Sequence, residues 1–307
     1  MKTSMPTKIE GLIAATFTPL SNDGDLDLEK VPEIVAHLQR SNINGIYING
    51  STGEGPSLMI PERKTLAEAY VNAARGKLTT IVQIGTDSLE ESRALASHAD
   101  EIGADAISST PPCYFKPTDA STLADCAAMV ASGASNLPYF YYHIPALTGV
   151  TIDMEDFLSI AGKQIPNLSG IKFCSTNMHE MRRCMSLENG RYQMLSAWDE
   201  MLLSGLATGV TGAVGSTYNF AAPIYLKMID AFNDGDMNNA RLWQDRALEM
   251  IHCLFKTCGR AGLKTMMKLI GHDCGPHRLP IKNSTPEQTE DLRRQMEELG
   301  FFDWIQS

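Results

Sequence analysis

Short apolar segments alternate with longer amphipathic segments along most of the chain. Eight of the short segments have the length of strands and end at glycine, proline or polar residues. Most are continuously hydrophobic, which is typical of strands covered on both faces. They are Leu12–Thr18, Gly45–Asn49, Thr80–Ile84, Asp105–Thr110, Pro138–Ile144, Leu168–Cys174, Tyr192–Trp198 and Val210–Gly215. Asp105–Thr110 carries the weakest signal because half of its residues are polar.

Helical patterns fill the intervals between these strands. Apolar residues recur with a period near 3.6 over Leu28–Leu38. The same period predicts a helix over 88–102, with Ser88 as its N-cap and Glu91 three residues further on. After the eighth strand the pattern is purely helical. The helices predicted there are Pro223–Phe232, Asn238–Thr257, Leu263–Ile270 and Pro286–Leu299.

Eight strands, each followed by a helix or a helical turn, predict an α/β fold of the (β/α)8 TIM-barrel class. The alternative is an open doubly wound sheet, which normally carries a glycine-rich phosphate loop after its first strand. Residues 18–24 read Thr-Pro-Leu-Ser-Asn-Asp-Gly and do not form such a loop. We therefore expect a barrel over residues 1–235 and a C-terminal helical extension over 236–307, packed on the barrel as a single structural unit.

Composition narrows the class of protein further. The net charge is -10 and no lysine–arginine cluster is present, so a nucleic-acid partner is not expected. The seven cysteines include no C-x-x-C pair, which favours free thiols and a cytoplasmic location. No apolar run reaches 18 residues, and residues 1–11 lack the apolar core of a signal peptide. Neither a membrane span nor an export signal is predicted.

Lys172 is the first candidate for chemistry, because it lies in the otherwise mostly apolar strand Leu168–Cys174. Catalytic groups of barrels lie at the C-terminal ends of strands and in the loops that follow. A desolvated lysine is a nucleophile for carbonyls and forms Schiff bases. The simpler alternative is a lysine at a strand end whose ammonium reaches solvent.

The turn after the second strand is a second candidate, a binding site for a carboxylate. Three glycines surround Ser51 and Thr52 within Gly50–Gly55, so backbone N–H groups and two hydroxyls can face an anion. Glu54 is a candidate local strut or capping residue. A plain turn is the alternative.

The fifth strand ends in an aromatic cluster. Tyr141 and Tyr142 are adjacent and must point to opposite faces, so one enters the barrel and the other packs outward. Near a lysine, a tyrosine can serve as a proton shuttle; a purely structural tyrosine is the alternative. His143 has no H-x-H or H-E-x-x-H pattern beside it and is interpreted as structural. No metal site is predicted.

Polar residues follow the last two strands as well. Asp199 and Glu200 close the seventh strand, and the segment Gly215–Asn219 follows the eighth. A pair of carboxylates can hold a metal or accept hydrogen bonds from a polyhydroxylated ligand. Alternatively, Asp199 caps the next helix.

Taken together, these positions resemble the N-acetylneuraminate lyase branch of the dihydrodipicolinate synthase superfamily, over essentially the whole chain. Four motifs carry the resemblance in order and spacing: Gly50–Glu54 (Gly-Ser-Thr-Gly-Glu), Tyr141–Gly149 (Tyr-Tyr-His-Ile-Pro-Ala-Leu-Thr-Gly), Gly170–Lys172 and Gly215–Asn219 (Gly-Ser-Thr-Tyr-Asn).

The resemblance implies a role for each matching residue. Lys172 corresponds to the Schiff-base lysine and Tyr142 to the tyrosine that moves protons. The other matches all concern ligand binding: Ser51 and Thr52 for the keto-acid carboxylate, Tyr47 near that site, Tyr114 lent across a subunit interface, and Asp199, Glu200 and Ser216 for the sugar tail. Gly215, beside Ser216, is a further substrate-binding candidate. The resemblance also implies a homotetramer, sialic acid and pyruvate as ligands, and no metal or organic cofactor, because the lysine supplies the electron sink.

Leu147 separates the branches of the superfamily. Dihydrodipicolinate synthases usually place an arginine two residues after the strand-five proline, where it binds a second carboxylate. Leu147 cannot do so and suits a sialate lyase. Other positions depart from the family pattern: Ala197, Trp198, Cys174, His143 and Arg260-Ala261. The alternatives that remain are an aldolase for another keto-deoxy sugar acid, a dihydrodipicolinate synthase, and a non-catalytic keto-acid sensor.

Overall fold

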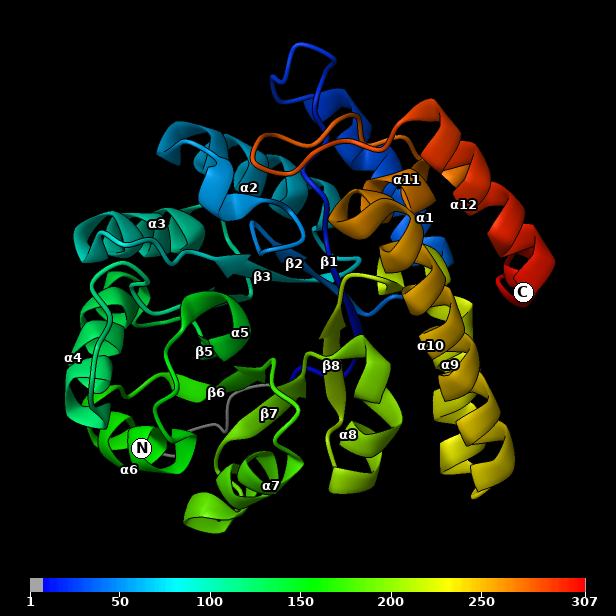
Figure 1. Ribbon diagram of the computed structural model, residues 1–307. Helices are drawn as coiled ribbons and strands as arrows, with labels where there is room; N and C mark the ends of the chain where they lie inside the picture. Colours follow the sequence, from blue (N-terminus) through cyan, green and yellow to red (C-terminus); the bar gives the residue numbers. More distant parts are fainter. Residues whose placement is uncertain (1–7, 307) are drawn as a thin grey trace.

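The computed structural model describes residues 8–306, so most of the N-terminal segment assessed for a signal peptide lies outside the described residues. Eight parallel strands form a closed barrel in chain order (Figure 1). The strands are β1 (Gly11–Ala15), β2 (Gly45–Ile48), β3 (Thr79–Gln83), β4 (Ala106–Ser109), β5 (Tyr139–His143), β6 (Leu168–Phe173), β7 (Gln193–Ser196) and β8 (Gly212–Gly215). Pairing of Gly11 with Gly212 closes the barrel, which confirms the predicted fold and excludes the open sheet.

Helices surround the barrel and continue beyond its last strand. Those that follow the strands are α1 (Val31–Arg40), α2 (Ile60–Ala74), α3 (Leu89–Glu101), α4 (Ala120–Ala131), α5 (Pro145–Thr148), α6 (Met154–Gln164), α7 (Met178–Ser186), α8 (Leu202–Thr208) and α9 (Tyr218–Asn233). The last four are α10 (Met237–Cys258), α11 (Gly262–Leu269), α12 (Pro286–Leu299) and α13 (Phe301–Trp304). Figure 1 shows α10 running beside α9, and none of the described helices is long and apolar enough to span a bilayer.

Most predicted elements are present, with shifted ends. The N-cap prediction at Ser88 is confirmed, because its side chain accepts a hydrogen bond from the N–H of Glu91. The helix predicted to start at Pro223 instead begins at Tyr218. The backbone is irregular at Ala221 (φ -129°), and this irregularity accommodates the proline inside the helix. All seven cysteines are free thiols.

Two layers of core follow from the alternation of side chains along the strands. Ile13, Ile81 and Leu195 belong to the cluster that fills the barrel interior. Tyr142 belongs to the same cluster, whereas Tyr141 packs outward against Phe157 of α6, with ring centroids 4.7 Å apart. The prediction that the two adjacent tyrosines divide between the two faces is therefore confirmed.

The segment between α11 and α12 crosses over the loops at the C-terminal end of the barrel. The N–H of Leu20 donates to the carbonyl of Cys274, and the guanidinium of Arg278 donates to the carbonyl of Gly24 and to the carboxylate of Glu62. Residues from the end of the chain thus lie beside the loops that follow β1 and β2.

Candidate active site

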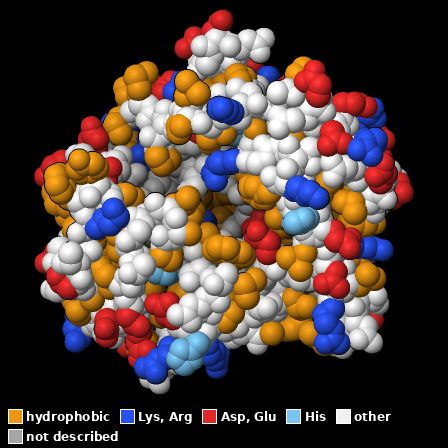
Figure 2. Space-filling model, viewed as in Figure 1, with side chains coloured by type: hydrophobic (Ala, Val, Ile, Leu, Met, Phe, Trp, Pro, Cys, Tyr) orange, Lys and Arg blue, Asp and Glu red, His pale blue; other side chains and the backbone are white. Residues whose placement is uncertain are grey.

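A cavity of about 260 Å³ opens at the C-terminal end of the barrel. Figure 2 shows a hollow near the centre of this face, with hydrophobic, acidic and basic side chains around it. The predicted residues that line the cavity are Ser51, Thr52, Tyr142, Leu147, Lys172, Asp199, Glu200, Gly215 and Ser216. Strands far apart in sequence therefore bring nine of the eleven predicted residues to one site.

Lys172 forms part of the floor of this cavity. The strand register explains this position, because Lys172 pairs with Tyr142 on the neighbouring strand and both side chains point into the barrel. Its side chain is 4% exposed, so the amine does not reach bulk solvent. The Nζ atom lies 3.5 Å from the centroid of the Tyr142 ring and 4.7 Å from that of Tyr47. Two aromatic faces thus take the place of water around the amine.

The phenol of Tyr142 connects the lysine with the turn after β2. Its hydroxyl lies 3.4 Å from Oγ of Ser51. The hydroxyl of Thr52 lies 2.6 Å from Oγ of Ser216, which joins the turn to the loop after β8. An amine, a phenol and three hydroxyls therefore line one cavity.

Tyr47 has a supporting position rather than a place in the cavity wall. It is fully buried, and its hydroxyl donates to Oγ of Ser108 over 3.0 Å. Burial raises the pKa of Tyr47 well above its ordinary value. The phenol remains protonated at neutral pH and fixes the ring beside Lys172.

The two acids after β7 have different surroundings. The carboxylate of Asp199 accepts hydrogen bonds from the N–H (2.9 Å) and the hydroxyl (2.6 Å) of Thr217, after β8. No side-chain cap is formed at the N-terminus of α8, so the alternative in which Asp199 caps that helix is wrong. Burial raises the pKa of Asp199, and bonds from Thr217 oppose this shift. Burial also raises the pKa of Glu200, whose half-buried side chain lines the cavity.

Leu147 and Tyr114 lie at different distances from the cavity. Leu147 lines it at the rim and is 62% exposed. Tyr114 is 78% exposed, packs edge-on against Phe115 and does not line the cavity of its own chain. Of the predicted residues, only Tyr47 and Tyr114 are absent from the wall.

Sequence reasoning did not assign the part of the wall that comes from the end of the chain. Ile251, Phe255, Arg260 and Leu263 line the cavity from α10, α11 and the turn between them. From the sequence, Arg260 is only a departure from the family pattern. Its guanidinium donates to the carbonyl of Ser51 over 2.5 Å. A helical period marks Ile251 and Phe255 as one face of a helix, and nothing local shows what that face covers.

His143 and Cys174 flank this site without joining its polar contacts. His143 packs on the outer side of β5 against the ring of Phe173, 5.1 Å away. Cys174 lines the cavity, and burial raises the pKa of its thiol. Within residues 8–306, no group of three or more His, Cys, Asp or Glu side chains is arranged to hold a metal ion.

Comparison with known proteins identifies the lineage of this site. A model of the Dihydrodipicolinate synthetase family matches residues 8–299. The chain belongs to this family.

Members of the family with similar sequences and structures are named as sialate lyases. N-acetylneuraminate lyase A of Xenopus laevis is 42% identical over 281 residues, which are 90% of this chain and 92% of the relative. N-acetylneuraminate lyase of Gallus gallus is 40% identical over 297 residues, 95% of this chain and 96% of the relative. The solved structure of Proteus mirabilis N-acetylneuraminate lyase superposes with a TM-score of 0.93 at 39% identity, covering 96% of this chain and all of that one.

Proposed function

We propose that this family member is a carbon–carbon lyase that cleaves N-acetylneuraminate into pyruvate and N-acetylmannosamine through a Schiff base on Lys172. The observation that carries this proposal is the burial of the Lys172 amine against the ring of Tyr142, 3.5 Å away, with Ser51 beside the phenol. A nucleophilic amine, a proton-transfer group and hydroxyl donors for a carboxylate are the groups that aldol cleavage of a keto acid requires.

The reaction begins with the open-chain keto form of the sugar acid. Its carboxylate accepts hydrogen bonds from Ser51 and Thr52, which directs the C2 carbonyl toward Lys172. The neutral amine adds to C2, and loss of water gives a protonated imine. The imine then acts as the electron sink for the next step.

Tyr142 accounts for proton transfer during bond cleavage. Its phenol donates a proton to the oxygen that leaves C2 as water, and the resulting phenolate removes the proton from the C4 hydroxyl, either directly or by way of the substrate carboxylate. The C3–C4 bond breaks, its electron pair enters the imine to form an enamine, and C4 becomes the aldehyde carbon of N-acetylmannosamine. Protonation of the enamine at C3 and addition of water release pyruvate and restore the amine.

The choice of sugar acid rests on the wall of the cavity and on the relatives. Asp199 and Glu200 accept hydrogen bonds from hydroxyl groups and disfavour a second anionic substrate. Leu147 offers no charge for a second carboxylate, which disfavours a dihydrodipicolinate synthase activity. The names of the Xenopus, Gallus and Proteus relatives support N-acetylneuraminate over other keto-deoxy acids.

Borohydride reduction in the presence of pyruvate tests the covalent step. We expect a stable adduct on the peptide that contains Lys172, located by mass spectrometry, and no adduct in Lys172→Ala. An unmodified Lys172 in the wild-type protein would contradict the mechanism. Retained pyruvate binding without trapping or turnover would support the sensor alternative instead.

Pyruvate release from a panel of sialic acids and 2-keto-3-deoxy acids tests the substrate. N-acetylneuraminate is expected to give the highest kcat/KM, with N-acetylmannosamine as the second product. Faster turnover of a deoxy acid such as 2-keto-3-deoxygluconate would assign the chain to another aldolase activity.

The proposal includes a cytoplasmic homotetramer. Tyr114, Phe115, Met59 and Leu147 are large apolar side chains that remain 62% or more exposed in the single chain. A neighbouring subunit would cover them and bring its own Tyr114 toward this site. Light scattering of the purified protein should give four times the chain mass.

A further inference from the structure

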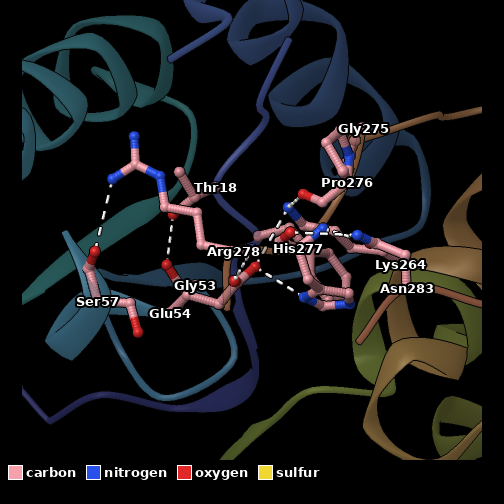
Figure 3. A network of polar contacts seen from close by, with 12 residues as sticks. Thr18, Gly53, Glu54, Ser57, Lys264, Gly275, Pro276, His277, Arg278 and Asn283 are labelled. Atoms are coloured by element: carbon pink, nitrogen blue, oxygen red, sulfur yellow. Dashed lines mark hydrogen bonds and ion pairs between the residues drawn. The ribbon is translucent and has the colours of Figure 1, made fainter. Parts of the chain in front are cut away.

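A buried carboxylate joins the turn that carries Ser51 and Thr52 to the end of the chain (Figure 3). The side chain of Glu54 is 2% exposed. One of its oxygens accepts a hydrogen bond from Nδ1 of His277 over 2.8 Å, and the other accepts one from the N–H of Arg278 over 2.9 Å. Nζ of Lys264 on α11 lies 3.2 Å from the first oxygen. Glu54 is therefore held by two separate segments of the C-terminal extension.

Lys264 also fixes the segment that follows α11. Its ammonium donates to the carbonyl of Pro276 over 2.6 Å, while its side chain is 4% exposed. Burial alone would raise the pKa of Glu54, but the hydrogen bond from His277 and the charge of Lys264 lower it below its ordinary value. The carboxylate is thus ionised in a site from which water is excluded. Removal of Glu54 or Lys264 alone would leave the charge of the other buried and uncompensated.

The turn needs such support because its backbone conformation is unusual. Asn49 (φ +59°) and Glu54 (φ +56°) both adopt the left-handed conformation, although neither is a glycine. This conformation is strained for a side chain such as that of Glu54, whereas asparagine adopts it more readily. Gly55 lies so close that a Cβ there would be 1.9 Å from the carbonyl of Asn49. Glycine therefore suits position 55, whereas the strained backbone at Glu54 persists only because the surrounding contacts maintain it.

We propose that Glu54, Lys264 and His277 are positioning residues that hold Ser51 and Thr52 ready to bind the carboxylate of a keto acid. The C-terminal extension then determines affinity for the carboxylate without touching the substrate. A turn held in its bound conformation loses less entropy on binding than one that must be ordered. This inference rests on the carboxylate-binding role of Ser51 and Thr52 in the proposed function.

Trapping with two ketones tests the inference on the full-length protein. Pyruvate carries the carboxylate, and methyl pyruvate retains the ketone without the negative charge. The concentration for half-maximal borohydride trapping and the limiting trapping rate are measured for wild type, Glu54→Gln and Lys264→Met. Lys227→Met is the matched control. Lys227 on α9 also donates to a carbonyl of the extension, that of Trp304, and lies away from the turn.

We expect half-saturation by pyruvate to rise roughly tenfold in both variants, the scale of a lost hydrogen bond to a charged group. The limiting rate and the half-saturation for methyl pyruvate should change less than about twofold, because neither depends on the binding of a negative charge by Ser51 and Thr52. The double variant should be no worse than the worse single variant, because it leaves no unpaired buried charge. Lys227→Met should behave as wild type.

Equal losses with the two ketones, or a lower limiting rate with unchanged half-saturation, would overturn the positioning role. If Glu54→Gln and Lys264→Met do not fold, as judged by circular dichroism, His277→Leu decides the question, since it leaves Glu54 paired with Lys264 and Arg278. An unchanged pyruvate half-saturation in that variant also overturns the inference. Absence of any adduct in wild type would instead refute the proposed function.

Discussion

The floor of the cavity and its outer wall are built in different ways. Lys172 and Tyr142 project from the adjacent strands β6 and β5, where parallel pairing fixes the backbone, and they are 4% and 3% exposed. Leu147 and Phe255 belong to helices outside the barrel and are 62% and 44% exposed. Arg260 comes from the turn between α10 and α11 and is half-buried.

This difference suggests that the floor carries out the reaction and that the wall selects the substrate. Groups on buried strands are held rigidly, which suits an amine and a phenol that must keep their distance during bond formation and cleavage. Groups on loops and outer helices can change without disturbing the barrel, so they suit the recognition of different ligands. Substitutions in the floor should therefore lower kcat, and substitutions in the wall should change KM and substrate preference.

Tyr142→Phe should have the largest effect among the variants that keep the covalent amine. The ring and its contact with the Lys172 ammonium remain, and only the hydroxyl is lost. We expect kcat for N-acetylneuraminate cleavage to fall about 10²-fold or more, the usual contribution of a general acid–base group. Tyr141→Phe is the matched control, because that tyrosine points outward from the same strand. Similar losses in both variants would show that strand packing, not proton transfer, determines the rate.

Glu200→Gln should change the wall while leaving the floor intact. Its carboxylate lines the cavity near the place proposed for the sugar tail. A neutral amide accepts hydroxyl hydrogen bonds less strongly, so KM for N-acetylneuraminate should rise roughly tenfold. Borohydride trapping of pyruvate, which has no sugar tail, should be unchanged. A reduced trapping rate would show that the division between floor and wall is wrong.

The barrel and its floor were predictable because their signals are local. Continuous apolar segments mark the strands, and a lysine within such a segment can be recognised from its immediate neighbours alone. The predicted strands extended into the following loops, as for Leu12–Thr18 against the observed Gly11–Ala15, because the first residues of those loops are also buried. Hydrophobicity records burial and does not distinguish a strand from a buried turn.

The part of the wall that comes from α10 and α11, and the Glu54 cluster, were not predictable in this way. Glu54 contacts His277 and Arg278, which lie 223 and 224 residues further along the chain. A buried ion pair has no periodicity, and each member alone resembles a surface residue. Asp199 shows the same ambiguity, since an acid before a helix is equally suited to cap it or to bond a neighbouring loop. Only the packing of the chain selects between these partners.

Substitution of His143, behind the floor of the cavity, should have the smallest effect on activity and a measurable effect on stability. His143 is on the outer side of β5 and is 3% exposed, and its Nδ1 has no hydrogen-bond partner among residues 8–306. Burial lowers the pKa of His143 to about 4. In the unfolded chain the imidazole binds a proton below about pH 6.5. The folded protein therefore loses stability relative to the unfolded chain as the pH falls from about 6.5 to about 4.

His143→Asn should remove this dependence, because an amide does not titrate in that range. Between pH 7 and pH 5, the wild type should lose about 2 kcal/mol of unfolding free energy more than the variant, at 1.36 kcal/mol per pH unit below 6.5. Urea unfolding at the two pH values measures this difference, in which the shared contributions of the carboxylates cancel. Equal losses of unfolding free energy in the two proteins would mean that His143 binds a proton as readily in the folded protein as in the unfolded chain. An unchanged kcat at neutral pH would confine this histidine to support of the floor.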